Sequence, residues 1–311
     1  MKTFGILALA ALLSACHMMR AEPSATPPAS LSQPSGAGVF DNHEQVWQAG
    51  ESHAVGVPHV VVSIEPAREA EWSVWHVRLD ATKPIEASWA FRLVVQGDGS
   101  SVLTPYRAVV SSPASAASFD ARQWTPLDAC ALRAPRPGTA LSADVAACTA
   151  IAPGIGAEAA LLPLAIDRDG EWLHARLYAD QARGAEARED LRLVRWFAGW
   201  AAINGGGAKA DAANRDWHMD RDVRIGSEGG RYALHWRDGA PSGYSLVLER
   251  LTYREGNVPV LKLAIVDDAD SGTLAYAWAN PEATRIGINL GWVQVGLSRE
   301  DQPAGVAGAP K

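Results

Sequence analysis

Cysteine, phenylalanine and clustered basic charge are all scarce in this chain. Its 311 residues include 3 Cys and 5 Phe, and 28 Lys and Arg face 35 Asp and Glu. No Lys/Arg cluster offsets the acidic balance, which argues against nucleic acid as a partner and against a polybasic membrane patch. The apolar run at residues 4–13 is too short to span a bilayer as a helix, and no second run approaches that length. We therefore expect no nucleic-acid partner and no transmembrane segment.

Several motifs that mark enzyme classes are also absent. The sequence has no GxSxG nucleophile elbow, no P-loop, no GxGxxG fingerprint and no HExxH zinc motif. The acidic stretch at residues 267–272 lacks the glutamate of a calcium loop, because Ala279 stands at the twelfth position counted from Asp268. We expect a turn there and no cofactor. A non-enzymatic role is favoured, with enzyme activity left open.

The chain does have a characteristic beginning, MKTFGILALAALLSAC. Lys2 is followed by the apolar run and then by small residues, a pattern typical of a secretory signal peptide at residues 1–15. The sequence Leu-Ser-Ala-Cys at residues 13–16 resembles the lipobox of bacterial lipoprotein precursors. The alternative is an ordinary secreted protein that is cut near the same place.

The resemblance to lipoprotein precursors covers these sixteen residues and implies a location. In that family the cysteine receives a diacylglycerol, the signal is cut before it, and the new amine is acylated with a chain such as palmitate. The resemblance thus implies that Cys16 is the lipidated first residue of the mature protein. His17 stands where aspartate would favour inner-membrane retention. In a Gram-negative cell this implies an outer-membrane anchor facing the periplasm, with exposure at the cell surface left open.

The two remaining cysteines, Cys130 and Cys148, form an even pair in a chain that is expected to be exported. In an oxidising compartment such a pair predicts one disulfide. The segment between them contains prolines and a glycine and shows little periodicity, so it is typical of a loop. Metal ligation and two buried thiols are the alternatives, although no companion cysteine or nearby histidine supports a metal.

The composition and the strand signals predict a division of the chain into segments. These are the signal peptide (1–15), a lipidated Cys16 with a disordered tether rich in Pro, Ser and Ala (16–38), an N-terminal β-rich module (39–180), a C-terminal antiparallel β module (190–300) and a disordered tail (301–311). The polar stretch at 181–189 makes the boundary, and 111–156 reads as an irregular insertion that carries the cysteine pair.

Short β-branched or alternating runs separated by Gly, Asp, Asn and Pro turns dominate both modules. The predicted fold class is therefore mainly β, an antiparallel sandwich or small-barrel-like architecture in two modules. Residues 191–203 are ambiguous, because their beginning alternates like a strand while Trp196 and Trp200 have helical spacing. We favour a strand there.

An acidic stretch at residues 214–223, NRDWHMDRDV, is the strongest candidate for chemistry. In an extended chain its acidic and imidazole side chains project from one face at two-residue spacing. The candidate metal ligands are Asp216, His218, Asp220 and Asp222. Carboxylates and imidazole suit a divalent cation, and crowded carboxylates also suit acid/base catalysis. The alternative, which we favour, is a solvated face neutralised by neighbouring arginines.

Twelve tryptophans against five phenylalanines is an unusual aromatic balance. Tryptophan is favoured at protein interfaces and where a ring meets a sugar or peptide, and Trp217 is the first candidate binding aromatic. The expected role is binding of an envelope protein or glycan, or assembly in the periplasm. An envelope hydrolase that uses the acidic face, and an inhibitor or immunity lipoprotein, are the alternatives. A deep pocket with acidic and aromatic side chains would favour the enzyme, and a flat exposed tryptophan patch would favour binding.

Overall fold

The computed structural model describes residues 36–53, 56–109, 116–211, 213–253 and 257–300. The signal peptide, Cys16, the tail and nearly all of the tether lie outside these described residues. Within them the chain is mainly β, with antiparallel pairing, and forms a barrel followed by two facing sheets. The predicted fold class is confirmed. Over the same ranges, no helix combines the length and the apolar character that a membrane crossing requires.

Ten strands close the N-terminal barrel, because β4 pairs with both β3 and β5. Going round the barrel, they are β1 (Gly38–Asp41), β2 (His59–Pro66), β3 (Trp72–Asp80), β4 (Ile85–Val95), β5 (Ser101–Ala108), β7 (Leu132–Ala134), β8 (Leu141–Ser142), β9 (Pro163–Asp169), β10 (Trp172–Leu177) and β11 (Glu189–Leu193). The short β6 (Trp124–Pro126) adds to β5. The strands alternate as expected: in β2, Val60, Val62 and Ile64 are buried in the core while their neighbours are half-buried.

The segment around the cysteine pair completes this barrel. It contains the short strands β6 to β8, the helix α2 (Val145–Ile155) and several one-turn helices, among them η1 (Ala116–Ser118), η2 (Ala121–Gln123), η3 (Asp128–Cys130) and η4 (Ala157–Leu161). Cys130 and Cys148 form the predicted disulfide, which joins η3 to α2, and both are fully buried. Strands of two and three residues are too short to show a period, so the sequence reads as irregular where the chain closes the barrel.

Replacing both cysteines with serine should lower the free energy of unfolding by about 3 kcal/mol, because the disulfide restricts the unfolded chain over a loop of this size. The two residues are 18 apart in sequence. Urea denaturation of the variant and of the parent protein measures the difference. An unchanged midpoint would show that the disulfide contributes nothing to stability.

The C-terminal module is a sandwich of two four-stranded sheets. One sheet has the order β13-β12-β19-β18 and the other β14-β15-β16-β17. The strands are β12 (Trp196–Asn204), β13 (Trp217–Gly226), β14 (Glu228–His235), β15 (Pro241–Tyr253), β16 (Val258–Asp267), β17 (Thr273–Ala279), β18 (Arg285–Asn289) and β19 (Val293–Arg299), with a one-turn helix η6 (Gly207–Lys209) between β12 and β13. One apolar core, with Phe197 from the first sheet and Leu246 and Leu263 from the second, lies between them.

The ambiguous stretch at residues 191–203 consists of two strands that belong to different modules. β11 pairs with β1 and β10 in the barrel, while β12 pairs with β13 and β19 in the sandwich. The chain passes from one module to the other at Val194 and Arg195. The strand interpretation agrees with this finding, and the passage lies a few residues after position 190, where the sequence placed the start of the second module.

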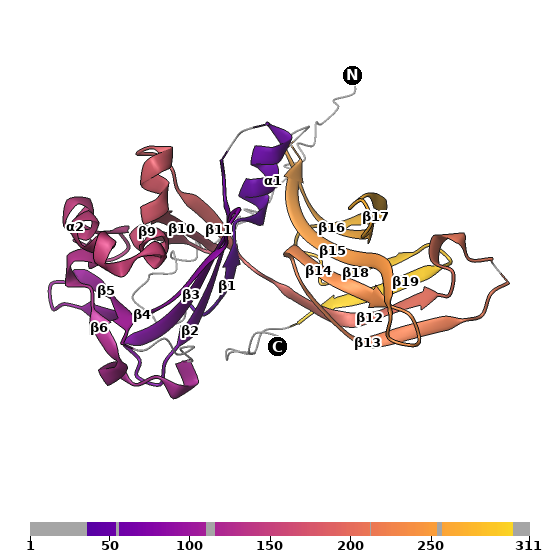
Figure 1. Ribbon diagram of the computed structural model, residues 1–311, viewed down its shortest axis with the longest axis horizontal. Helices are drawn as coiled ribbons and strands as arrows, with labels where there is room; N and C mark the ends of the chain where they lie inside the picture. Colours follow the sequence, from indigo (N-terminus) through magenta and orange to yellow (C-terminus); the bar gives the residue numbers. More distant parts are fainter. Residues whose placement is uncertain (1–35, 54–55, 110–115, 212, 254–256, 301–311) are drawn as a thin grey trace, which may run out of the picture.

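A buried group of charges joins the two modules beneath the helix α1 (His43–Glu51), which lies between them in Figure 1. Arg192 of the barrel and Arg250 of the sandwich both bind the carboxylate of Glu228, at 2.7 and 2.5 Å. Glu171 forms an ion pair with Arg250 at 2.9 Å, and Glu44 of α1 forms one with Arg192 at 2.7 Å. Because charges need partners when they are buried, this network favours one fixed arrangement of the modules.

A second buried polar group fixes the start of α1 against the barrel. Asn42 donates a hydrogen bond to Glu189 at 2.6 Å, and Arg183 pairs with both Glu189 and Asp180. Arg183 and Asp180 belong to the short helix η5 (Tyr178–Arg183). Burial and the nearby Asp180 raise the pKa of Glu189 to about 7, although Arg183 opposes the shift.

This raised pKa makes stability fall with rising pH. In the unfolded chain Glu189 ionises near its ordinary pKa of 4.5, but in the folded protein only near 7. Between these values the folded state holds a proton that the unfolded state has released, so the free energy of unfolding decreases as pH rises through this window. Glu189→Gln should abolish this decrease in the free energy of unfolding, which amounts to about 2–3 kcal/mol across the window. Urea titrations at several pH values measure it, and an unchanged slope would contradict the assignment.

Candidate binding surface

The local structure of β13 keeps His218 and Asp220 on one face but separates Asp222 from them. Ala201 of β12 pairs with Asp220 and Gly199 with Val223, so one extra residue is inserted in β13 between these pairs. This β-bulge turns Asp222 away from the face that Asp220 occupies. Asp216 precedes the strand and pairs with Arg237 at 2.9 Å.

Asp220 has a specific partner inside the sandwich. It accepts a hydrogen bond from the hydroxyl of Tyr232. Burial tends to raise the pKa of Asp220, but this bond, a backbone N–H and the charges of His218 and His235 outweigh it, and the pKa is lowered. Burial and the same carboxylate raise the pKa of Tyr232. In the described part of the chain, no three His, Cys, Asp or Glu side chains are arranged to hold a metal ion.

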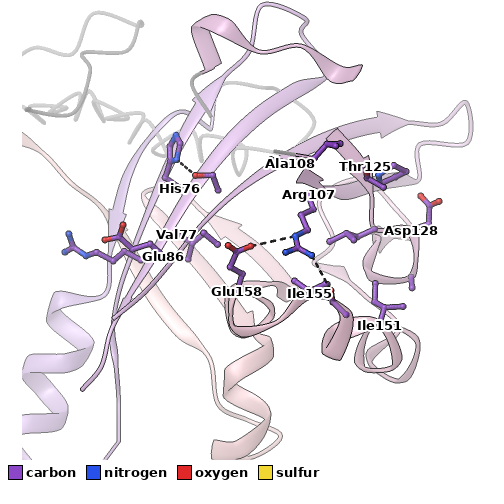
Figure 2. A pocket seen from close by; sticks show the side chains of 18 of the residues that line it. His76, Val77, Glu86, Arg107, Ala108, Thr125, Asp128, Ile151, Ile155 and Glu158 are labelled. Atoms are coloured by element: carbon purple, nitrogen blue, oxygen red, sulfur yellow. Dashed lines mark hydrogen bonds and ion pairs between the residues drawn. The ribbon is translucent and has the colours of Figure 1, made fainter. Parts of the chain in front are cut away.

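A wide groove of about 1450 Å³ lies at one side of the barrel (Figure 2). On one wall, from β3 and β4, the Nδ1 atom of His76 lies 2.8 Å from the hydroxyl of Ser88. On the other wall, Arg107 of β5 pairs with Glu158 at 3.9 Å and donates to the carbonyl of Gly154 at 3.3 Å. Figure 2 shows that these two pairs come from different walls and do not point toward one another.

The groove does not have the arrangement that an acyl-transfer site needs. His76 and Ser88 are direct cross-strand neighbours in the β3–β4 ladder, so their hydrogen bond is typical of sheet pairing. Among the described residues, no ion pair joins a carboxylate to His76, and no tryptophan or tyrosine lines the groove. The deep pocket with acidic and aromatic side chains that would favour an enzyme is therefore not found at this groove.

A chain of aromatic rings, half-buried at one end and exposed at the other, lies instead on the outer face of the sandwich, beside α1. We call its four residues, Trp47, Tyr253, Tyr276 and Trp278, the aromatic surface. Consecutive ring centroids are 5.3 Å apart for Trp47 and Tyr253, 5.4 Å for Tyr253 and Trp278, and 5.1 Å for Trp278 and Tyr276. The fractional exposures of Tyr276 and Trp278 are 54% and 55%. Single exposed aromatic side chains are common on protein surfaces, but contiguous exposed apolar patches mark interaction sites.

The strand period of β17 places two of these rings in solvent. Leu274, Tyr276 and Trp278 alternate with alanines and point away from the core. Leu274 is 46% exposed, and Val258, opposite Tyr253 in the β15–β16 ladder, is 51% exposed. The aromatic surface therefore has an aliphatic border.

The helix α1 adds Trp47 and anchors the other end of the surface. Gln48 of α1 donates to the backbone carbonyl of Thr252, and His43 bonds Glu249 at 3.0 Å. Lys262, which lies opposite Trp278 in the sheet, binds the other oxygen of Glu249 at 3.0 Å. Burial tends to raise the pKa of Glu249, but His43 and Lys262 outweigh it and lower the pKa. The charged groups next to the rings are thus already paired with each other.

The sequence predicted a binding role for Trp217, whereas the tryptophans of the aromatic surface are Trp47 and Trp278. Trp217 is half-buried at the start of β13 and is not part of the aromatic surface, although its carbonyl accepts a hydrogen bond from Arg237 at 2.9 Å. The alternation in TLAYAWA of β17 was a usable signal, because it puts only large apolar side chains on one face. The contribution of Trp47 had no such signal, since 206 residues separate it from Tyr253.

Comparison of the chain with protein-family models, with curated proteins and with solved structures finds no match. The assignment of a function therefore depends on the geometry of the described residues and on the sequence pattern at the N-terminus.

Proposed function

We propose that this protein is a lipid-anchored bacterial envelope protein that binds another protein through its aromatic surface. The observation that carries the proposal is the continuous chain of four rings, ending in the exposed Tyr276 and Trp278. Tryptophan and tyrosine dominate the binding energy of protein interfaces, because they bury a large area at a low cost in conformational entropy. An inhibitor or immunity lipoprotein would use such a surface in the same way.

A protein fits this surface better than a glycan. Leu274 and Val258 border the rings with aliphatic area, which a sugar does not match. A sugar also needs hydrogen-bonding groups that fix its hydroxyls, and the nearest candidates, Glu249 and Lys262, already bind each other. An apolar centre with polar groups that are satisfied internally is the composition of a protein-binding patch.

The anchor is proposed from the resemblance at residues 1–16. Lipid on Cys16, followed by the segment rich in Pro, Ser and Ala, would keep the folded modules tethered to the outer membrane on its periplasmic side. Cys16→Ser should abolish the incorporation of radiolabelled palmitate into the protein. Labelling that survives this change would contradict lipid anchoring at Cys16.

Site-specific photo-crosslinking in intact cells tests the binding role. A photoreactive phenylalanine analogue at Tyr276 should give a covalent adduct with a defined protein, and the same analogue at Val94, an exposed position on the barrel, should give none. No adduct from position 276, or equal adducts from both positions, would rule out the aromatic surface as the binding site.

A further inference from the structure

The strand β17 lies at the edge of its sheet and, unlike the other edge strands of the sandwich, carries no charged residue. It pairs with β16 on one side, and among the described residues no strand pairs with it on the other. Its sequence, TLAYAWA, contains no charged residue and no proline, and it pairs regularly with β16 from Ala275 to Ala279, after an irregularity at Leu274. Proteins generally protect such edges with charges, prolines or bulges, because unpaired N–H and C=O groups accept a further strand.

The other edges of the sandwich carry this protection. β13 contains Asp220, Asp222 and arginines, and it has a bulge. β14 contains Arg231 and is irregular at two places in its pairing with β15, while β18 begins with Arg285. Among the described edge strands of the sandwich, β17 is therefore the one without a charged side chain, and the exposed rings of the aromatic surface stand on the same strand.

The side chains of β17 are complementary to a second copy of themselves. If two β17 strands pair antiparallel about a two-fold axis at Tyr276, that residue lies opposite its twin, and Leu274 lies opposite Trp278 of the other copy. All of these side chains lie on the outer face, so the two aromatic surfaces become continuous. On the inner face Ala275 lies opposite Ala277, and these small side chains allow the strands to approach.

We propose that β17 pairs with β17 of a second copy of this chain, which joins the two four-stranded sheets into one sheet across a symmetric dimer. The proposal rests on the proposed function and names the partner that the aromatic surface binds. A two-fold interface of this type is closed, because each copy uses the same edge of its own sheet. No charge is buried unpaired, because β17 has none.

Charge variants at the two-fold axis test this directly. In the full chain, purified in detergent at a large excess of micelles, light scattering should show a dimer. Tyr276→Lys and Tyr276→Glu should each weaken self-association by at least about 100-fold, because like charges face each other across the axis. An equimolar mixture should restore the dimer, and that restoration also shows that both variants are folded. A monomeric parent protein, or a mixture that stays monomeric, would overturn the proposal.

Disulfide trapping in membranes gives a second measurement. Tyr276→Cys should form a covalent dimer under mild oxidation, since directly opposed side chains are close enough for a disulfide, whereas Leu274→Cys should not, because its twin lies four residues along the opposite strand. If the photoreactive analogue at position 276 captures a different protein and Tyr276→Cys gives no dimer, protein binding stands and the second copy is excluded. If neither gives an adduct, both proposals fail.

Discussion

Replacing Arg250 with alanine should lower the free energy of unfolding by about 3–5 kcal/mol, because it leaves a buried carboxylate without its main partner. Only 2% of the Arg250 side chain is exposed, and Glu228 is fully buried beside it. Arg250 also donates to the carbonyl of Leu193 at 2.6 Å, the last residue of the barrel. Equilibrium urea denaturation of the parent protein and of the variant measures the loss.

Two further variants separate this effect from a general cost of removing arginine. Arg231→Ala removes an exposed pair with Asp268 in the same sheet, and it should cost no more than about 1 kcal/mol. The double variant Arg250→Met, Glu228→Gln should recover much of the loss, because it removes both charges and Arg192 keeps its pair with Glu44. An Arg250→Ala variant as stable as Arg231→Ala would contradict the role of the buried network in holding the modules together.

Replacing Trp278 with alanine should weaken protein binding by at least about 30-fold, which corresponds to an interface hot spot of about 2 kcal/mol. Trp278 contacts both Tyr253 and Tyr276, so its loss interrupts the chain of rings at its centre. The binding is measured as the yield of adduct from a photoreactive residue at Leu274 over a range of protein concentrations. Stability should change little, since the side chain is more than half exposed.

The matched control for this variant is Trp200→Ala. Trp200 is 38% exposed and stands in the same module, on the other sheet, where it lies against Gly296. Its replacement should leave the adduct yield unchanged. If Trp200→Ala and Trp278→Ala reduce the yield equally, the aromatic surface has no special role in binding.

Much of the β structure could be predicted, because alternation and turn residues are local signals. The strand at 72–79 was readable largely from its alternation, and the strands from 231 onward from short apolar runs bounded by Gly, Asp and Asn turns. β7 and β8 could not be found in this way, since they are too short to have a period and depend on neighbours distant in sequence. The break at Val194, which divides one apolar run between two modules, is likewise fixed by long-range pairing.

The candidate site shows the same limit. The two-residue spacing from Asp216 to Asp222 predicted a shared face, but the bulge in β13 shifts Asp222, and no local pattern marks a bulge. The exposed rings of β17 were readable from its alternation. Their continuation through Tyr253 to Trp47 depends on the packing of α1 across the sandwich, which involves residues far apart in the chain.

Hydroxyl-radical footprinting of Trp278 and Tyr276 tests most directly whether a protein covers the aromatic surface. Labelling of the two side chains is compared between the protein in native envelopes and the purified protein at high dilution, with Trp200 as the internal reference. If a protein covers the aromatic surface, Trp278 and Tyr276 are labelled several-fold less in the envelope, while Trp200 is labelled equally in both. Equal labelling of all three residues in the two states would contradict such coverage.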